Sequence, residues 1–331
     1  MKHVLKLFTI AVLTAVLPIC SLSDEPGPRS AGAFRPPATP LVVHDPYFSV
    51  WSMSDNLTDL STKHWTGTTQ SLCGLVRVDR KSYRIIGNEP RTTPALAQTR
   101  HDVLPTHTVY GFEGAGIKLT LTFLNPAIPQ DMELVSRPVT YVTWSVVSAD
   151  GKSHDVQIYF DAGSELVVNI PEQRVVWGRY HVRNLQVLRM GSQEQPVLQK
   201  SGDSLRIDWG YLYLVSEPGK GVSESATVRA EATKLFMETG RVPDSDELEV
   251  DQPYGQPLPV LAECFDLGQV GSSPVARHVV LAYDDLYSVA FLQRELRPYW
   301  RRNGTEVGDL LQSALRDYDS LERRSTTLIR S

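Results

Sequence analysis

The sequence predicts an all-β dominated protein: an antiparallel β-sandwich with a short aromatic-rich N-terminal segment and a C-terminal amphipathic helix. Three observations predict this class. Residues 117–123 alternate strictly between apolar and polar side chains, as a strand with one buried face does. Further short strand signals follow without intervening helices, and turn signals such as Asp150-Gly151 separate them. A series of this kind favours an antiparallel sandwich.

Length and composition agree with a folded globular protein. The chain has 331 residues, of which 41% are hydrophobic and 21% are charged. It is long enough for two ordinary domains or one large β-domain with appendages. The net charge of -5, without a basic run, excludes nucleic acid as an expected partner.

The first residues have the pattern of a signal peptide, expected at 1–23. A positively charged start precedes an apolar run over residues 7–19, which is shorter than the ~20 residues of a membrane-spanning helix. Residues 21–23 fit a small-x-small cleavage site. We therefore expect a secreted or periplasmic protein, with a lipoprotein anchored at Cys20 as the alternative. No transmembrane span is expected.

The remaining elements follow in order. A linker rich in Pro, Gly, Ala and Ser is expected at 24–40, the aromatic-rich segment at 41–88, the β-sandwich domain at 89–305, and a helix at 306–331 that starts a truncated helical domain. Strands are expected at residues 73–78, 82–86, 117–123, 139–148, 154–160, 205–209, 211–215 and 277–283.

The C-terminal helix has apolar residues at helical spacing over 309–321, with Asp309 placed to cap it. This stripe either packs on the sandwich or is meant for a domain that is absent. Helix is expected to be concentrated after Tyr287. After cleavage two cysteines remain, Cys73 and Cys264, which either pair once or are both small buried apolar residues.

Local catalytic motifs are absent from the sequence. It contains no zinc-protease His pair, Walker loop, G-x-S-x-G elbow or Cys-x-x-Cys. His101 and His107 flank Pro105 at a spacing that fits no zinc pattern. Neither a metal nor a cofactor is therefore expected, and the catalytic residues stay unassigned.

Two aromatic patches carry the candidate ligand- or domain-contact residues: His44, Asp45, Tyr47, Trp51, His64 and Trp65, to which we add the more distant Asp161. His44 and Asp45 either form a general base with a carboxylate or, since neighbours on a strand face opposite ways, satisfy backbone groups before a turn. The aromatic residues either form a platform for a flat ligand or a sugar, or a buried wedge in which both Trp51 and Trp65 are largely covered.

These patches, HDPYFSVWS at 44–52 and HWTG at 64–67, resemble the N-terminal region of the glutaminase A family. The resemblance continues in GLVRVD at 74–79, RPVTY at 137–141, VQIYFD at 156–161, PYWRR at 298–302 and ALRDY at 314–318. Arg80 departs from the glycine that the family tends to have there.

The resemblance implies a secreted protein whose supersandwich-like β-region precedes a helical-hairpin toroid, similar to glycoside hydrolases, where hydrolysis of L-glutamine takes place. On that basis the chain is expected to be the non-catalytic N-terminal region, inactive alone, with a helical-hairpin catalytic domain as partner. Two alternatives stay open. One is a carbohydrate-binding or glycan-processing accessory module, and the other is a small amidase with its site around His44, Asp45, His64 and Asp161.

Overall fold

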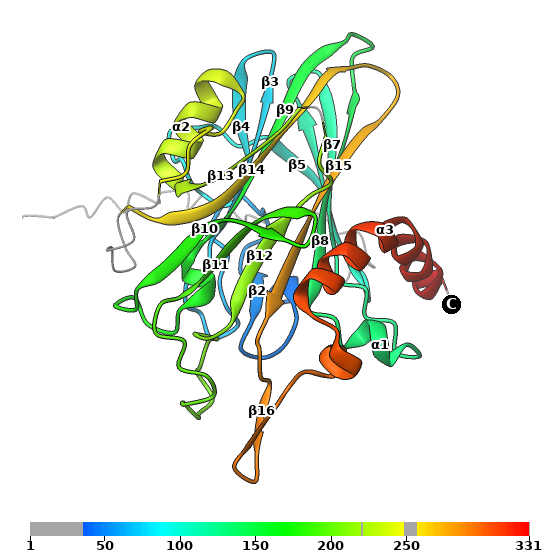
Figure 1. Cartoon of the computed structure of the whole chain (residues 1–331). Helices are drawn as coiled ribbons and strands as arrows, with labels where there is room; N and C mark the ends of the chain where they lie inside the picture. Colours follow the sequence, from blue (N-terminus) through cyan, green and yellow to red (C-terminus); the bar gives the residue numbers. More distant parts are fainter. Residues whose placement is uncertain (1–35, 220, 248–256, 331) are drawn as a thin grey trace, which may run out of the picture. The chain divides into compact units, whose positions relative to one another are not determined.

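The computed structural model describes residues 36–219, 221–247 and 257–330. The expected signal peptide at 1–23, Cys20, and most of the expected linker lie outside these residues. Within them the chain folds into two antiparallel sheets with helices on their outer faces, so the prediction of a β-dominated sandwich is confirmed (Figure 1).

The larger sheet has eight strands among the described residues, in the order β10-β11-β12-β15-β8-β7-β6-β5. Every neighbouring pair is antiparallel. Its strands are β5 (Ala97–Val103), β6 (His107–Gly114), β7 (Ile117–Leu124), β8 (Val139–Ser148), β10 (Val175–Val182), β11 (Leu185–Ser192), β12 (Tyr211–Val215) and β15 (Val275–Asp284).

The smaller sheet has five strands among the described residues, in the order β13-β14-β9-β3-β4. They are β3 (Leu72–Val78), β4 (Lys81–Ile86), β9 (His154–Gly163), β13 (Val222–Val228) and β14 (Pro259–Val270). Two short ladders complete the strands: β1 (Thr39–Val43) with β2 (Ser49–Ser52), and β16 (Val289–Phe291) with β17 (Arg294–Leu296). The helices are α1 (Met132–Val135), α2 (Arg229–Thr239) and α3 (Val307–Arg330), and the 3-10 turns are η1 (Ser164–Val167) and η2 (Tyr299–Gly304).

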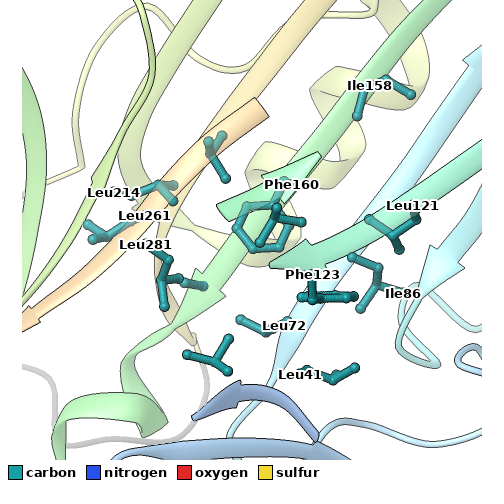
Figure 2. Close-up of a cluster of buried hydrophobic side chains, with 14 of the residues drawn as sticks. Leu41, Leu72, Ile86, Leu121, Phe123, Ile158, Phe160, Leu214, Leu261 and Leu281 are labelled. Atoms are coloured by element: carbon teal, nitrogen blue, oxygen red, sulfur yellow. The ribbon is translucent and has the colours of Figure 1, made fainter. Parts of the chain in front are cut away.

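The main core lies between the two sheets. Leu121 and Phe123 of β7 reach it from the larger sheet, and Ile158 and Phe160 of β9 reach it from the smaller one (Figure 2). The apolar residues of β7 are at most 1% exposed, whereas Lys118 between them is exposed. The alternation of the sequence therefore assigns the buried face of this strand correctly.

Helix α3 covers the outer face of the larger sheet. Leu311 is 0% exposed, and the Tyr141 hydroxyl of β8 donates a hydrogen bond to the Ala314 carbonyl at 2.8 Å. The apolar stripe is thus packed on the sandwich, as one of the two interpretations expected. The helix begins at Val307, and Asp309 accepts a hydrogen bond from the Glu306 backbone N–H at 3.1 Å.

Helix α2 covers the outer face of the smaller sheet and was not predicted. Phe236 packs there with Tyr159 of β9, at a ring separation of 5.4 Å. Cys73 and Cys264 lie in the same cluster as free, buried thiols. Their interpretation as small buried apolar residues is confirmed. The expectation that helix is concentrated after Tyr287 is also confirmed among the described residues, because α3 is longer than α1 and α2 together.

The prediction of a strand at residues 205–209 is wrong. This segment is not in a sheet. The Ile207 N–H donates to the Tyr47 carbonyl at 2.9 Å, and the Arg206 N–H donates to Asn169 Oδ1 at 3.1 Å. Its backbone groups are therefore satisfied by a loop and a side chain instead of a neighbouring strand.

Candidate functional site

A cavity of about 640 Å³, here called the His44 cavity, is lined by residues from five parts of the sequence. The lining residues are His44, Asp45, Pro46, Tyr47, Val135, Ser136, Arg137, Pro138, Ile207, Trp209, Tyr283, Asp285, Ser288, Val289, Phe291, Leu296, Arg297, Pro298, Tyr299 and Trp300. A largely apolar, aromatic cavity with a few polar groups is the usual setting of a ligand site. It is the candidate functional site of this chain.

His44 is a neutral imidazole whose tautomer is set by its neighbours. Asn125 Nδ2 donates to the Leu41 carbonyl at 3.0 Å, so Asn125 Oδ1 is the atom that accepts from the Thr140 hydroxyl at 2.6 Å. Thr140 has then used its one proton and must accept from His44 Nε2–H at 3.0 Å. Nδ1 of His44 therefore carries a lone pair, and it has no partner among the described residues. Burial lowers the pKa of His44 to about 3.

Asp45 holds the loop that forms the adjacent wall. Its Oδ1 accepts hydrogen bonds from the backbone N–H groups of Tyr47 at 2.7 Å and Phe48 at 3.0 Å. Burial raises the pKa of Asp45, and these two bonds act against that shift. Asp45 thus satisfies backbone groups at a turn, as one of the two interpretations expected, and it is not the partner of His44.

His64 and Trp65 hold the same loop through hydrogen bonds to the Pro46 carbonyl. His64 Nε2 donates to the Pro46 carbonyl at 3.1 Å, and Trp65 Nε1 donates to the same oxygen at 2.6 Å. Burial lowers the pKa of His64 to about 4. Neither residue lines the cavity. Trp65 is 48% exposed, so the expectation that it is largely buried is wrong, because its indole lies over a loop instead of in the core.

The aromatic residues of the first patch divide between core and cavity. Phe48 is fully buried, with its ring 4.4 Å from that of Tyr283. Tyr47 lines the cavity, with its ring 6.1 Å from that of Trp209. Trp51 lies away from the cavity, where its indole N–H donates to the Ser49 hydroxyl at 3.1 Å. Part of this patch is thus a buried wedge and part is a cavity wall.

Two adjacent carboxylates at the end of β15 have different surroundings. Asp284 is 2% exposed and forms a salt bridge with Arg301, whose Nε donates to it at 3.1 Å. Asp285 lines the cavity, and its Oδ2 accepts a hydrogen bond from the Ser288 hydroxyl. Burial and the nearby charges of Asp45 and Asp284 raise the pKa of Asp285 to about 6, against the effect of that bond. Its Oδ1 is buried without a partner among the described residues.

Asp161 lies elsewhere, in a buried network of the smaller sheet. Arg229 Nε donates to both of its carboxylate oxygens at 3.0 Å, and Arg229 Nη1 donates to the Ser71 hydroxyl at 2.7 Å. The Tyr159 hydroxyl donates to Asp161 Oδ2 at 2.7 Å. The fold therefore brings His44, Asp45 and Tyr47 together and leaves Asp161 out of the cavity.

Sequence reasoning missed the other half of the cavity. Trp209, Tyr283 and Asp285 carry no local motif, and Trp300 lies in PYWRR at 298–302, which indicated only the family. A signal was present in the acidic pair that directly follows the apolar strand 277–283.

Among the described residues, no group of three or more His, Cys, Asp or Glu side chains is placed to hold a metal ion. No helix in the described ranges is long and apolar enough to cross a membrane.

Comparison with known proteins gives two family matches. A family model described as Domain of unknown function (DUF5127) matches residues 106–328, and one described as Domain of unknown function (DUF4964) matches residues 16–97. Among solved structures, one named for kojibiose phosphorylase, from the human microbiome, is 10% identical, with a TM-score of 0.37 and coverage of 84% of this chain and 30% of that chain.

Two curated relatives carry glutaminase names. Glutaminase A of Aspergillus oryzae is 28% identical over 270 residues, which cover 79% of this chain and 39% of that protein. The protein named Probable glutaminase of Arthroderma benhamiae is 23% identical over 330 residues, which cover 87% of this chain and 37% of that protein. The chain thus spans about two-fifths of the length of these relatives. The matches confirm the resemblance seen in the motifs: the chain belongs to the DUF5127 family and is glutaminase-A-like.

Proposed function

We propose that this chain is the non-catalytic β-sandwich region of a secreted glutaminase-A-like protein and does not hydrolyse L-glutamine by itself. The observation that carries the proposal is that the four residues of the small-amidase alternative, His44, Asp45, His64 and Asp161, all form bonds that maintain the fold. His44 Nε2 is held by Thr140, His64 holds the Pro46 carbonyl, and Asp161 is paired with Arg229. Amide hydrolysis needs a nucleophile, a base and an oxyanion donor around one point.

The histidines are also poor general bases. A general base is most effective when its pKa lies near the working pH. Burial lowers the pKa of His44 to about 3 and that of His64 to about 4, so both remain neutral and weakly basic near neutral pH. Within the part of the chain that the structure describes, no carboxylate bonds to His44 to orient it or to stabilise its protonated form.

The partner in this proposal is a helical-hairpin catalytic domain, corresponding to the length of the relatives that this chain does not span. Its docking face would be the rim of the His44 cavity, where Phe291 is 59% and Leu292 is 81% exposed. A two-stranded hairpin is marginally stable alone, and contiguous exposed apolar residues usually mark an interaction surface.

The decisive assay measures ammonia release from L-glutamine by the purified chain. We expect no turnover above the protein-free blank. Asp45→Asn and Asp285→Asn serve as cavity variants, and the exposed Asp203→Asn serves as a matched control. Turnover by the parent that either cavity variant loses and the control keeps would contradict the proposal and place an active site in the sandwich.

The docking face has a separate test. Hydroxyl-radical footprinting should find Phe291 and Leu292 reactive in this chain, and the aligned hairpin protected in full-length Glutaminase A of Aspergillus oryzae. Equal reactivity of the hairpin in both proteins would exclude it as the docking face.

Export is a further part of the proposal. The mature protein is expected to begin near Asp24, and intact-mass spectrometry of the exported chain measures this directly. A diacylated Cys20 at the N-terminus would instead establish the lipoprotein alternative.

A further inference from the structure

The His44 cavity has hydrogen-bond acceptors that the protein itself does not satisfy. Asp45 and Asp285 both line this cavity and form no ion pair within the described part of the chain, and the charge of Asp45 contributes to the raised pKa of Asp285. One Asp285 oxygen and the Nδ1 lone pair of His44 have no hydrogen-bond partner there either. Buried acceptors of this kind are costly unless a donor reaches them.

Residues of the same walls also carry hydrogen-bond donors. Trp300 is 2% exposed, lines the cavity, and its indole N–H has no acceptor among the described residues. Arg137 and Arg297 are lining residues as well, and each guanidinium group has one carboxylate partner outside the cavity, Asp317 and Glu306 respectively. A ligand that satisfies this wall must both donate and accept hydrogen bonds.

This requirement selects among ligand classes. A simple organic cation has no acceptor for the indole and would face two guanidinium groups. An anion would face the two carboxylates that have no cation partner. Hydroxyl groups donate and accept at the same atom, so a neutral polyhydroxylated molecule satisfies both sets.

The apolar part of the lining fits the same class. The rings of Tyr47 and Trp209 lie 6.1 Å apart at the wall, and Phe291 and Tyr299 add two more aromatic side chains. Aromatic rings offer flat apolar surfaces that can cover the C–H face of a pyranose. The volume of about 640 Å³ lies within the usual range for small-molecule sites.

We propose that the His44 cavity binds a neutral sugar ring, one or two pyranose units long, against Tyr47 and Trp209, with hydroxyl groups bonded to Asp45 and Asp285. The terminal torsion of an aspartate is soft, so the carboxylate of Asp285 can turn its free oxygen to a ligand hydroxyl. This binding role goes beyond the proposed non-catalytic function and does not depend on it.

Isothermal titration of the full chain tests the proposal. The probes are maltose, cellobiose, lactose and mannobiose, each at about 10 mM, a concentration that detects dissociation constants near 1 mM. Choline and L-glutamine are the counter-probes. At least one disaccharide should bind, and neither counter-probe should compete with it.

Two cavity variants are used, so that the proposal is still tested if one of them misfolds. Tyr47→Ala removes a ring and Asp285→Asn removes a charge at nearly constant shape, and each should weaken the sugar by at least about tenfold, or ~1.4 kcal/mol. Asp203→Asn should bind like the parent, and circular dichroism checks the fold of all three. No binding by any disaccharide, binding that the cavity variants leave unchanged, or competition by choline or L-glutamine would each overturn the proposal. Failure here would leave the absence of glutamine turnover untouched.

Discussion

Glu263 is expected to make the stability of this protein fall as pH rises. It lies on β14 between Leu261 and Phe265 in the alternation, so its side chain shares their core-facing side. It is 0% exposed, and both carboxyl oxygens have no hydrogen-bond partner among the described residues. Glu224 is its direct cross-strand neighbour on β13. Burial, and then the charge of Glu224, raise the pKa of Glu263 to about 8, against a smaller opposing effect of Ser216.

The sign follows from comparing folded and unfolded chains. Below the ordinary pKa of 4.5 the carboxyl is neutral in both states and contributes no pH dependence. Between 4.5 and about 8 it ionises only in the unfolded chain, so the free energy of unfolding falls with rising pH. A difference of about 3.5 pKa units at 1.36 kcal/mol each gives an upper limit of about 5 kcal/mol by pH 8.

Glu263→Gln keeps the shape and removes the ionisation. Urea unfolding followed by tryptophan fluorescence should therefore show little difference from the parent near pH 5. The variant should become the more stable protein by several kcal/mol near pH 8. Exposed Glu172→Gln is the matched control and should follow the parent throughout. A difference between Glu263→Gln and the parent that does not change with pH would refute this reasoning.

Three other predictions concern the remaining parts of the fold. Two carboxylate partners, Asp79 and Asp150, raise the pKa of His154, so the stability that it contributes is present below its ordinary pKa and is lost as pH rises through the raised value. His154→Ala should flatten that part of the pH profile of Tm. A profile that does not change in the variant contradicts the prediction. Arg229→Met leaves the buried charge of Asp161 without its partner and should lower the free energy of unfolding, measured in urea, by about 3–5 kcal/mol. Adding Asp161→Asn should restore part of this loss in the double variant. Losses that simply add in the double variant would argue against coupling of the two residues. Leu311→Ala should cost about 2–5 kcal/mol by the same measurement, whereas a loss below about 0.5 kcal/mol would mean that α3 is not packed on the sheet.

The sequence by itself determined the elements whose pattern is local. The alternation at 117–123 gave β7 (Ile117–Leu124) with its buried face, because the side chains of a strand repeat every two residues. Asp79 and Arg80 have φ of 48° and 69° in the tight turn between β3 and β4, the two strands that the sequence predicts at 73–78 and 82–86. The motifs at 44–52 and 64–67 indicated the family. The strand that was wrongly expected at 205–209 shows that a local residue pattern does not by itself establish a strand.

Only the tertiary structure decided which residues meet. The loop at 44–47 was singled out from sequence, but Trp209 and Asp285 reach the same cavity from more than 150 residues away. Asp161 looked equally plausible along the chain, yet Arg229 holds it in another part of the fold. The stripe of α3 fitted either the sandwich or an absent domain until the outer face of the larger sheet was seen to bury it. Hydrophobic burial is non-directional, so periodicity predicts that a face will be covered without specifying what covers it.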